Sequence, residues 1–188
     1  MTQGRKEKVF AILGGLLFAS LTLRDFGKFR ESSDPYFFLI GLRAFLVTCL
    51  YFTRAPAKMR APTLITALSV LLSGIPLFYQ SDLTVSPCVP LAFTWSLLVA
   101  GNLLAIWGIA SLGKAFGIGP AFRTVVRDGP YRLLKHPIYT GYVAAELGFL
   151  LMYPNRWNAS VFTAAALAYI FRAKLEERVL QAAADRNN

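Results

Sequence analysis

The sequence predicts an all-α polytopic membrane protein: a bundle of about five to six transmembrane helices that ends in a helical hairpin. Its 188 residues are 55% hydrophobic and only 16% charged, which is too apolar for an ordinary soluble domain. The apolar residues also fall into separate blocks, most of them close to the length of a membrane-spanning helix. The blocks cover residues 9–23, 36–52, 63–79, 88–112, 138–153 and 157–171.

The basic residues predict which side of the membrane each loop occupies. The formal charge is +10, and the Lys and Arg residues flank the apolar blocks, which is the pattern of membrane-anchored loops and of no nucleic-acid-binding module. With six spans, one side holds fifteen basic residues and the other four. The positive-inside rule therefore places both termini in the cytoplasm. We expect one integral membrane domain over 1–188, at the plasma membrane if the chain is bacterial, with four transmembrane helices in 1–112.

The two cysteines indicate no redox or metal chemistry. Cys49 lies inside an apolar block and Cys88 beside one, so we interpret both as packing residues and expect neither a disulfide framework nor a metal site.

The segment 113–137 breaks the helical pattern and is the first candidate functional region. It has too many Gly, Pro and Arg residues to span a bilayer, and loops of this length in compact folds are usually functional. Pro137 suits the first turn of a helix, so we expect His136 near the N-cap, where unpaired N–H groups favour an anion. At helical spacing Tyr139, Tyr142 and Glu146 then share one face.

A second candidate region lies where the last apolar block continues into a C-terminal cytoplasmic helix. Arg172 and Glu176 are four residues apart and therefore neighbours on one helical face. The turn at 154–156 makes an antiparallel hairpin of the last two blocks, and His136 and Glu176 lie at similar distances on either side of it. Both regions should therefore meet in one pocket at the cytoplasmic interface, covered by the 113–137 loop.

The motif GPYRLLKHPIYTGY followed by LEERVL resembles the isoprenylcysteine carboxyl methyltransferase family and its relatives, the phospholipid methyltransferases. The two motifs cover about the last third of the chain. Lys135 stands where Arg is commoner in that family, which keeps the charge but loses the planar fork of a guanidinium.

This resemblance implies a methyltransferase that uses S-adenosylmethionine, embedded in the bilayer and acting on a lipophilic small molecule or a prenylated substrate. It implies that the 113–137 loop binds the cofactor, and that Arg172 and Glu176 are catalytic, with Arg172 orienting the acceptor. The residues expected to bind the cofactor are Tyr131, His136, Pro137, Tyr139, Gly141 and Glu176.

Other interpretations of these residues and of the chain remain open at this stage. His136 can simply cap a helix, and Glu146 can form a structural ion pair with Arg43, because an acid in an apolar span needs a partner. The basic loop at 54–60 is expected to hold anionic lipid. The alternative functions are an NADPH-dependent enzyme similar to steroid reductases, and a transporter or scaffold without a cofactor.

Overall fold

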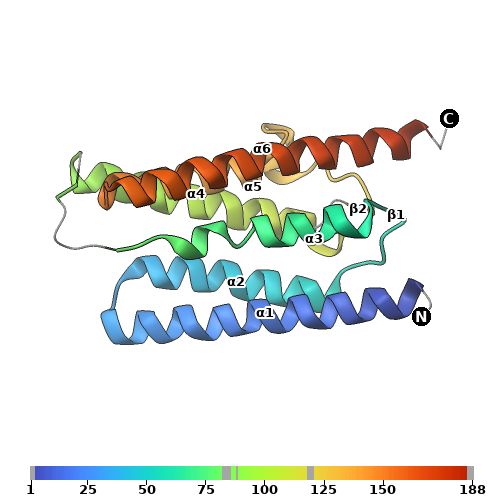
Figure 1. The fold of residues 1–188 in the computed structure, drawn as a ribbon, viewed down its shortest axis with the longest axis horizontal. Coiled ribbons are helices and arrows are strands. Elements are labelled where there is room, and N and C mark those ends of the chain that lie inside the picture. Colours follow the sequence, from blue (N-terminus) through green and yellow to red (C-terminus); the bar gives the residue numbers. More distant parts are fainter. Residues whose placement is uncertain (1–2, 82–85, 88, 118–120, 186–188) are drawn as a thin grey trace.

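In the part of the chain that the structure describes, six α-helices run along the long axis of the molecule (Figure 1). The computed structural model describes residues 3–81, 86–87, 89–117 and 121–185. The α-helices are α1 (Gln3–Ser32), α2 (Pro35–Thr53), α3 (Thr63–Leu72), α4 (Leu91–Leu112), α5 (Pro137–Met152) and α6 (Arg156–Asp185). The short elements are the 3-10 turns η1 (Ile75–Phe78), η2 (Gly113–Ala115) and η3 (Gly129–Arg132), and the strands β1 (Met59–Arg60) and β2 (Ala121–Phe122). The predicted all-α bundle with a C-terminal helical hairpin is confirmed, apart from this one strand pair.

Two helices of the described residues are long and apolar enough to cross a membrane, namely α2 and the segment Leu91–Ala115 that begins with α4. The segments Leu64–Phe78 and Pro137–Met152 are apolar but shorter. Length and composition thus support a membrane protein, while five to six crossings are not confirmed by this criterion.

The third apolar block is not the continuous helix that the sequence predicts. Helix α3 ends at Leu72, and the chain then makes the 3-10 turn η1. Gly74 lies at the break, and Pro76 in η1 has no N–H to continue an α-helical ladder. The third apolar block therefore forms a short α-helix followed by a 3-10 turn, with a break between them.

Helix α1 does not end with the first apolar block, 9–23, but continues through the charged residues 24–30 to Ser32. The chain reverses at Ser33, whose φ is 55°, and the Asp34 carboxylate caps α2 by accepting from the Tyr36 N–H at 2.9 Å. Within the extended part of α1, the buried carboxylate of Asp25 pairs with Arg24 at 2.7 Å.

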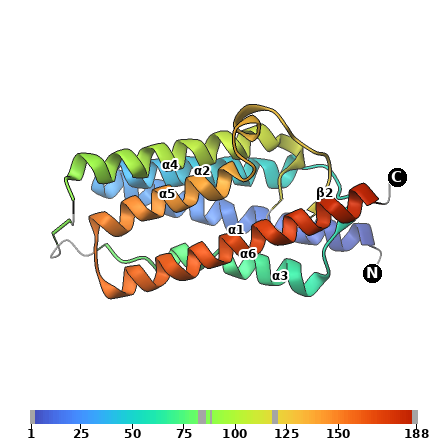
Figure 2. The ribbon, with the colours of Figure 1, turned by 90° about the horizontal axis from the view of Figure 1, so that it is seen from above.

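Helices α4 and α5 pack closely because glycines let their backbones approach. A Cβ added to Gly141 would lie 2.6 Å from the Gly101 carbonyl oxygen and 2.7 Å from the Ala105 nitrogen. Figure 2 shows α4 and α5 side by side, with α6 and α3 on the other side of α5.

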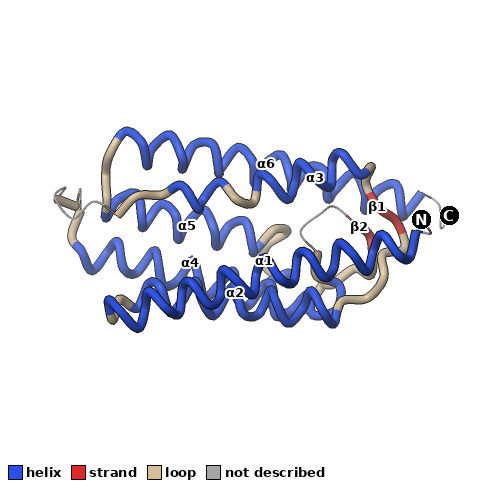
Figure 3. Tube along the Cα trace, turned by 60° about the horizontal axis from the view of Figure 1, so that its bottom comes forward, coloured by secondary structure: helices blue, strands red, loops and turns tan. Residues whose placement is uncertain are grey.

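The 113–137 segment is anchored at the end of the bundle where both termini lie (Figure 1). Strand β2 pairs antiparallel with β1, which places Phe122 opposite Met59 (Figure 3). The Ala55 N–H donates to the Lys114 carbonyl at 2.8 Å, and Arg123 Nε donates to the Ala55 carbonyl at 2.9 Å. The loop is therefore tied to the connection between α2 and α3. Residues 118–120 of this loop, and Cys88, lie outside the described residues.

Replacing Gly141 by alanine should destabilise the protein, because the new methyl group meets backbone atoms that cannot rotate away. Overpacking of this kind typically costs about 1–3 kcal/mol. The matched control is Gly27→Ala in α1, where a Cβ meets nothing within 4 Å, and which should gain up to about 1 kcal/mol of helix propensity. Thermal unfolding in detergent measures both; equal stabilisation by the two substitutions would contradict the packing of α4 on α5.

Candidate functional site

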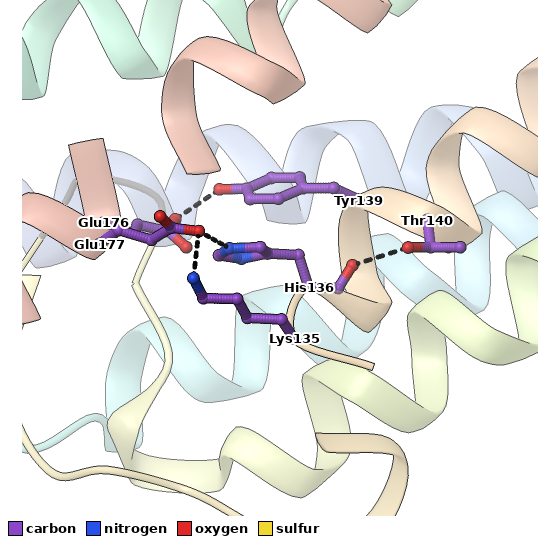
Figure 4. Close-up of polar contacts among 6 residues, drawn as sticks. All are labelled: Lys135, His136, Tyr139, Thr140, Glu176 and Glu177. Carbon is purple, nitrogen blue, oxygen red and sulfur yellow. Dashed lines mark hydrogen bonds and ion pairs between the residues drawn. The ribbon is translucent and has the colours of Figure 1, made fainter. Parts of the chain in front are cut away.

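The start of α5 fixes the first group of candidate side chains. His136 is the N-cap and Pro137 the first helical residue, as the sequence predicts. The backbone N–H and the hydroxyl of Thr140 both donate to the His136 carbonyl, at 3.0 and 3.1 Å. This holds the backbone while the imidazole points toward α6 (Figure 4).

Two adjacent carboxylates of α6 bind polar side chains from the start of α5 (Figure 4). Glu177 lies 2.9 Å from His136 Nε2 and 2.8 Å from Lys135 Nζ, both measured to Oε1. The Tyr139 hydroxyl donates to Glu176. The predicted meeting of the two motifs is therefore confirmed as geometry, across the hairpin of α5 and α6.

Arg172 lies one helical turn before Glu176 and is 5% exposed. Its guanidinium carbon is 5.2 Å from the centroid of the Tyr139 ring, a cation–π distance. The arginine, the tyrosine and the glutamate thus form one cluster at the junction of α5 and α6.

A ladder of tyrosines continues from this cluster into the bundle. The Tyr139 and Tyr169 rings are stacked with centroids 5.8 Å apart, and Tyr142 lies 5.5 Å from Tyr169. The Tyr169 hydroxyl donates to the buried carboxylate of Glu146. The predicted face of α5 that carries Tyr139, Tyr142 and Glu146 is confirmed, since all three contact Tyr169.

The predicted ion pair between Arg43 and Glu146 is wrong for the residues that the structure describes. Glu146 instead accepts from Tyr169 and, at 3.3 Å, from the Tyr79 hydroxyl. Arg43 Nη1 donates to the Asn102 side chain at 3.2 Å, and its guanidinium lies 4.7 Å from the centroid of Tyr142. The hydrogen bonds to the Glu146 carboxylate therefore come from tyrosine hydroxyls of two other segments of the chain. The sequence of α5 alone cannot reveal these partners.

A cavity of about 850 Å³ connects these groups. Five of the predicted site residues line it: Tyr131, His136, Tyr139, Arg172 and Glu176. Part of the 113–137 loop also lines it, through residues 123–127. The loop therefore lies against the cavity, as expected for a cover.

Pro137 and Gly141, the other two predicted cofactor-binding residues, face α4. Pro137 is fully buried and its Cγ lies 3.5 Å from where a Cβ on Gly108 would be. Gly141 meets the backbone of α4 at Gly101 and Ala105. Both residues therefore pack α5 against α4. Neither of them lines the cavity that the other five predicted site residues share.

The two neighbouring carboxylates have opposite pKa shifts. Hydrogen bonds from Lys135 and His136 lower the pKa of Glu177 to about 2. Burial raises the pKa of Glu176 above its ordinary value, although the Tyr139 hydroxyl and Arg172 oppose the shift. Burial also raises the pKa of the Tyr131 hydroxyl, with Glu176 adding to it. Lys135 and His136 thus favour the anionic form of Glu177, whereas burial disfavours the anionic form of Glu176.

Sequence reasoning missed Tyr169 and the partners of Glu177. Tyr169 lies three residues before Arg172, so it shares the face that the Arg172 and Glu176 spacing defines; that spacing is the signal that could have found it. Within the described residues, no group of three or more His, Cys, Asp or Glu side chains lies close enough to hold a metal ion.

In the described residues, a helical bundle with two apolar helices of membrane-spanning length and a polar, tyrosine-lined cavity at a helix hairpin supports a class: membrane proteins with a candidate internal small-molecule site. A sequence model of the phospholipid methyltransferase family matches residues 89–183, just over half of the chain. The chain belongs to this family, which is grouped with the isoprenylcysteine carboxyl methyltransferase-like proteins, so the resemblance seen in the sequence is confirmed. No curated protein and no solved structure matches the chain.

The contribution of Glu177 to stability should disappear in acid. Its pKa is depressed in the folded protein, so its stabilising effect is present above the unfolded value of about 4.3 and is lost as the pH falls toward about 2. The melting temperature of wild type should therefore exceed that of Glu177→Gln by a small margin at about pH 5, and the margin should shrink in more acidic buffer. A margin that widens on acidification would contradict the bonds to Lys135 and His136.

Proposed function

We propose that the chain is an S-adenosylmethionine-dependent methyltransferase that acts at the cytoplasmic membrane interface on a lipophilic acceptor. The proposed acceptor is an isoprenylcysteine-like carboxylate or a related lipid. The observation that carries this proposal is the cluster of Tyr139, Arg172 and Glu176, which brings both family motifs to the wall of one cavity.

The residues of this cavity fit the proposed cofactor. Its volume of about 850 Å³ is in the range of small-molecule sites, which is about 300–1,000 Å³. When bound, the cofactor supplies a methyl group on a positively charged sulfur. Tyrosine faces and a carboxylate attract such a cation, and the cavity offers Tyr131, Tyr139 and Glu176. His136 completes the set of residues that would hold the cofactor, while Pro137 and Gly141 support it by packing α5 on α4.

For a carboxylate acceptor the protein needs only to orient the reactants. Arg172 can hold the carboxylate through a bidentate pair, and no proton has to be removed from it. Correct orientation can supply about 7–11 kcal/mol of the barrier reduction. The loop residues 124–127 lie on the cavity wall and would exclude water from the site.

An amine acceptor would require a general base, for which His136, Glu146 and Glu176 are the candidates. Glu146 already accepts from two tyrosine hydroxyls, and the buried cation of Arg172 disfavours an ammonium group nearby. These contacts favour the carboxylate acceptor.

We further propose that the chain crosses the bilayer six times, with its termini and active site on the cytoplasmic side. The location of both termini at one end of the bundle supports an even number of passes (Figure 1). The basic termini, the basic 54–60 connection and the basic 113–137 loop favour the cytoplasm for that end. Binding of anionic lipid by the basic 54–60 connection, which we also propose, would accord with this orientation. If the chain is bacterial, the membrane is the plasma membrane.

Calorimetric titration of the detergent-purified protein with S-adenosylhomocysteine should show binding, and NADPH in a parallel cell should show none. Glu176→Ala should abolish measurable binding, because the loss of one charged hydrogen bond alone costs about 1.5–3 kcal/mol, or roughly ten- to over a hundredfold in affinity. The control is Lys174→Ala, an exposed residue two positions earlier on α6, which should bind as wild type.

Three results would contradict these assignments. Wild-type affinity in a folded Glu176→Ala protein would remove this residue from the site. Binding of NADPH alone would favour the reductase-like enzyme, and binding of neither ligand by wild type would favour a transporter or a scaffold.

A further inference from the structure

Arg43 is a cation in the middle of the bundle that the proposed reaction does not use. It is the ninth of the nineteen residues of α2, one of the two helices that can span a membrane. A charge at that depth is costly unless it is paired or faces a polar cavity. Arg43 lines the 850 Å³ cavity.

The contacts of Arg43 orient its guanidinium without neutralising its charge. The buried Asn102 side chain accepts from Nη1 at 3.2 Å and donates its own amide to the Leu98 carbonyl at 2.9 Å, so the asparagine is held by α4. The Tyr142 ring lies under the guanidinium at 4.7 Å. In the part of the chain that the structure describes, no carboxylate lies within ion-pairing distance of Arg43.

Glu146 of α5, the acid that the sequence suggests as a partner of Arg43, forms hydrogen bonds with other residues. Glu146 is buried and accepts from the Tyr79 and Tyr169 hydroxyls, and these two tyrosines line the cavity in front of it. Glu146 is thus not part of the cavity lining, whereas Arg43 is. Arg24, Asp25 and Lys28 of α1 also line the cavity, and the acid among them, Asp25, is paired with Arg24. A guanidinium has five N–H donors in a planar fork that matches an oxyanion, and one of them is used by Asn102.

The position of Arg43 relative to the candidate site is given by the tyrosine ladder. Arg43 contacts Tyr142, which lies one helical turn deeper in α5 than Tyr139, the ring under Arg172. Both arginines therefore face one cavity, with Tyr139, Tyr169 and Tyr142 in sequence between them. A ligand that reaches the Arg172 cluster from within the bundle passes Arg43.

We infer that Arg43, held by Asn102 and Tyr142, forms an oxyanion-binding subsite that takes the acidic group of a lipophilic ligand inside the bundle. That this ligand is the methyl acceptor rests on the proposed function. In that case Arg43 is a specificity-determining residue that receives the acidic group before Arg172 orients it for methylation, and so selects acceptors with an anionic group against neutral or cationic lipids of the same length.

Equilibrium binding of labelled dodecanoate to the detergent-solubilised protein tests the subsite, with unlabelled dodecanoate, dodecanamide and dodecylamine as competitors. At about pH 8 the acid is ionised, and wild type should prefer it to the amide by at least about tenfold. Arg43→Gln should reduce this preference to less than about twofold, and Arg43→Lys should fall between them, since it keeps the charge and loses the fork. Equal competition by acid and amide in wild type would overturn the subsite without recourse to any variant.

Titration with S-adenosylhomocysteine separates this inference from the proposed function. Arg43→Gln should bind it as wild type does, because Arg43 lies one turn away from the residues assigned to the cofactor; a loss of cofactor binding that parallels the loss of dodecanoate binding would overturn the assignment of a separate subsite. If wild type binds no S-adenosylhomocysteine but its preference for dodecanoate depends on Arg43, the methyltransferase proposal fails and the subsite stands. A preference for the acid that persists in Arg43→Gln would overturn the subsite.

Discussion

The bonds between the start of α5 and the end of α6 are the interactions on which the rest of the site depends. The antiparallel hairpin brings the two segments to one height, and the bonds from Tyr139 to Glu176 and from His136 to Glu177 hold them there. At the opposite end the hairpin is fixed by Asn155, which accepts from the Asn158 N–H at 2.7 Å, and by Asn158, which binds the backbone at Gln80. With both ends fixed, neither helix can slide along the other without breaking polar contacts, and Arg172 keeps its place over the Tyr139 ring.

The covering loop depends on a second set of contacts, made with a different part of the chain. Its strand β2 pairs with β1, and Arg123 donates to the Ala55 carbonyl in the connection between α2 and α3. The loop also contacts the hairpin, because β2 lies against α6 and Lys135 pairs with Glu177. The loop is therefore held from both sides of the cavity, by the connection between α2 and α3 and by α6.

The sequence predicts the parts of the fold that spacing alone determines. The turn at 154–156 and equal counts on either side place His136 beside the last helix, and Pro137 sets the N-cap. Prediction from the sequence fails where contacts with distant segments of the chain determine the structure. Nothing in helix α5 reveals that the Tyr79 and Tyr169 hydroxyls will donate to Glu146. Nothing in 24–30 reveals that Asp25 is buried or that α1 continues through this charged segment. Gly141 illustrates a third case: a small residue in a motif is compatible with a close ligand or a close helix, and only the position of α4 decides.

The distribution of charge along the cavity bears on how a water-soluble cofactor and a lipophilic acceptor can share it. The end beneath the loop carries the charged groups of both signs, including Lys135, Glu176 and Arg172. Apolar residues of α1 and α2, such as Leu17, Ile40 and Val47, also line the cavity, together with Arg43 and the charged α1 residues Arg24, Asp25 and Lys28. A cofactor with several charged and hydroxyl groups is stabilised beside the charged cluster under the loop, whereas an apolar chain is stabilised against the apolar residues of α1 and α2. In the proposed methyltransferase the two reactants would therefore occupy different parts of the lining and meet beside Tyr139 and Tyr142. The place where these two parts of the lining meet would then determine which group of the acceptor is presented for methylation.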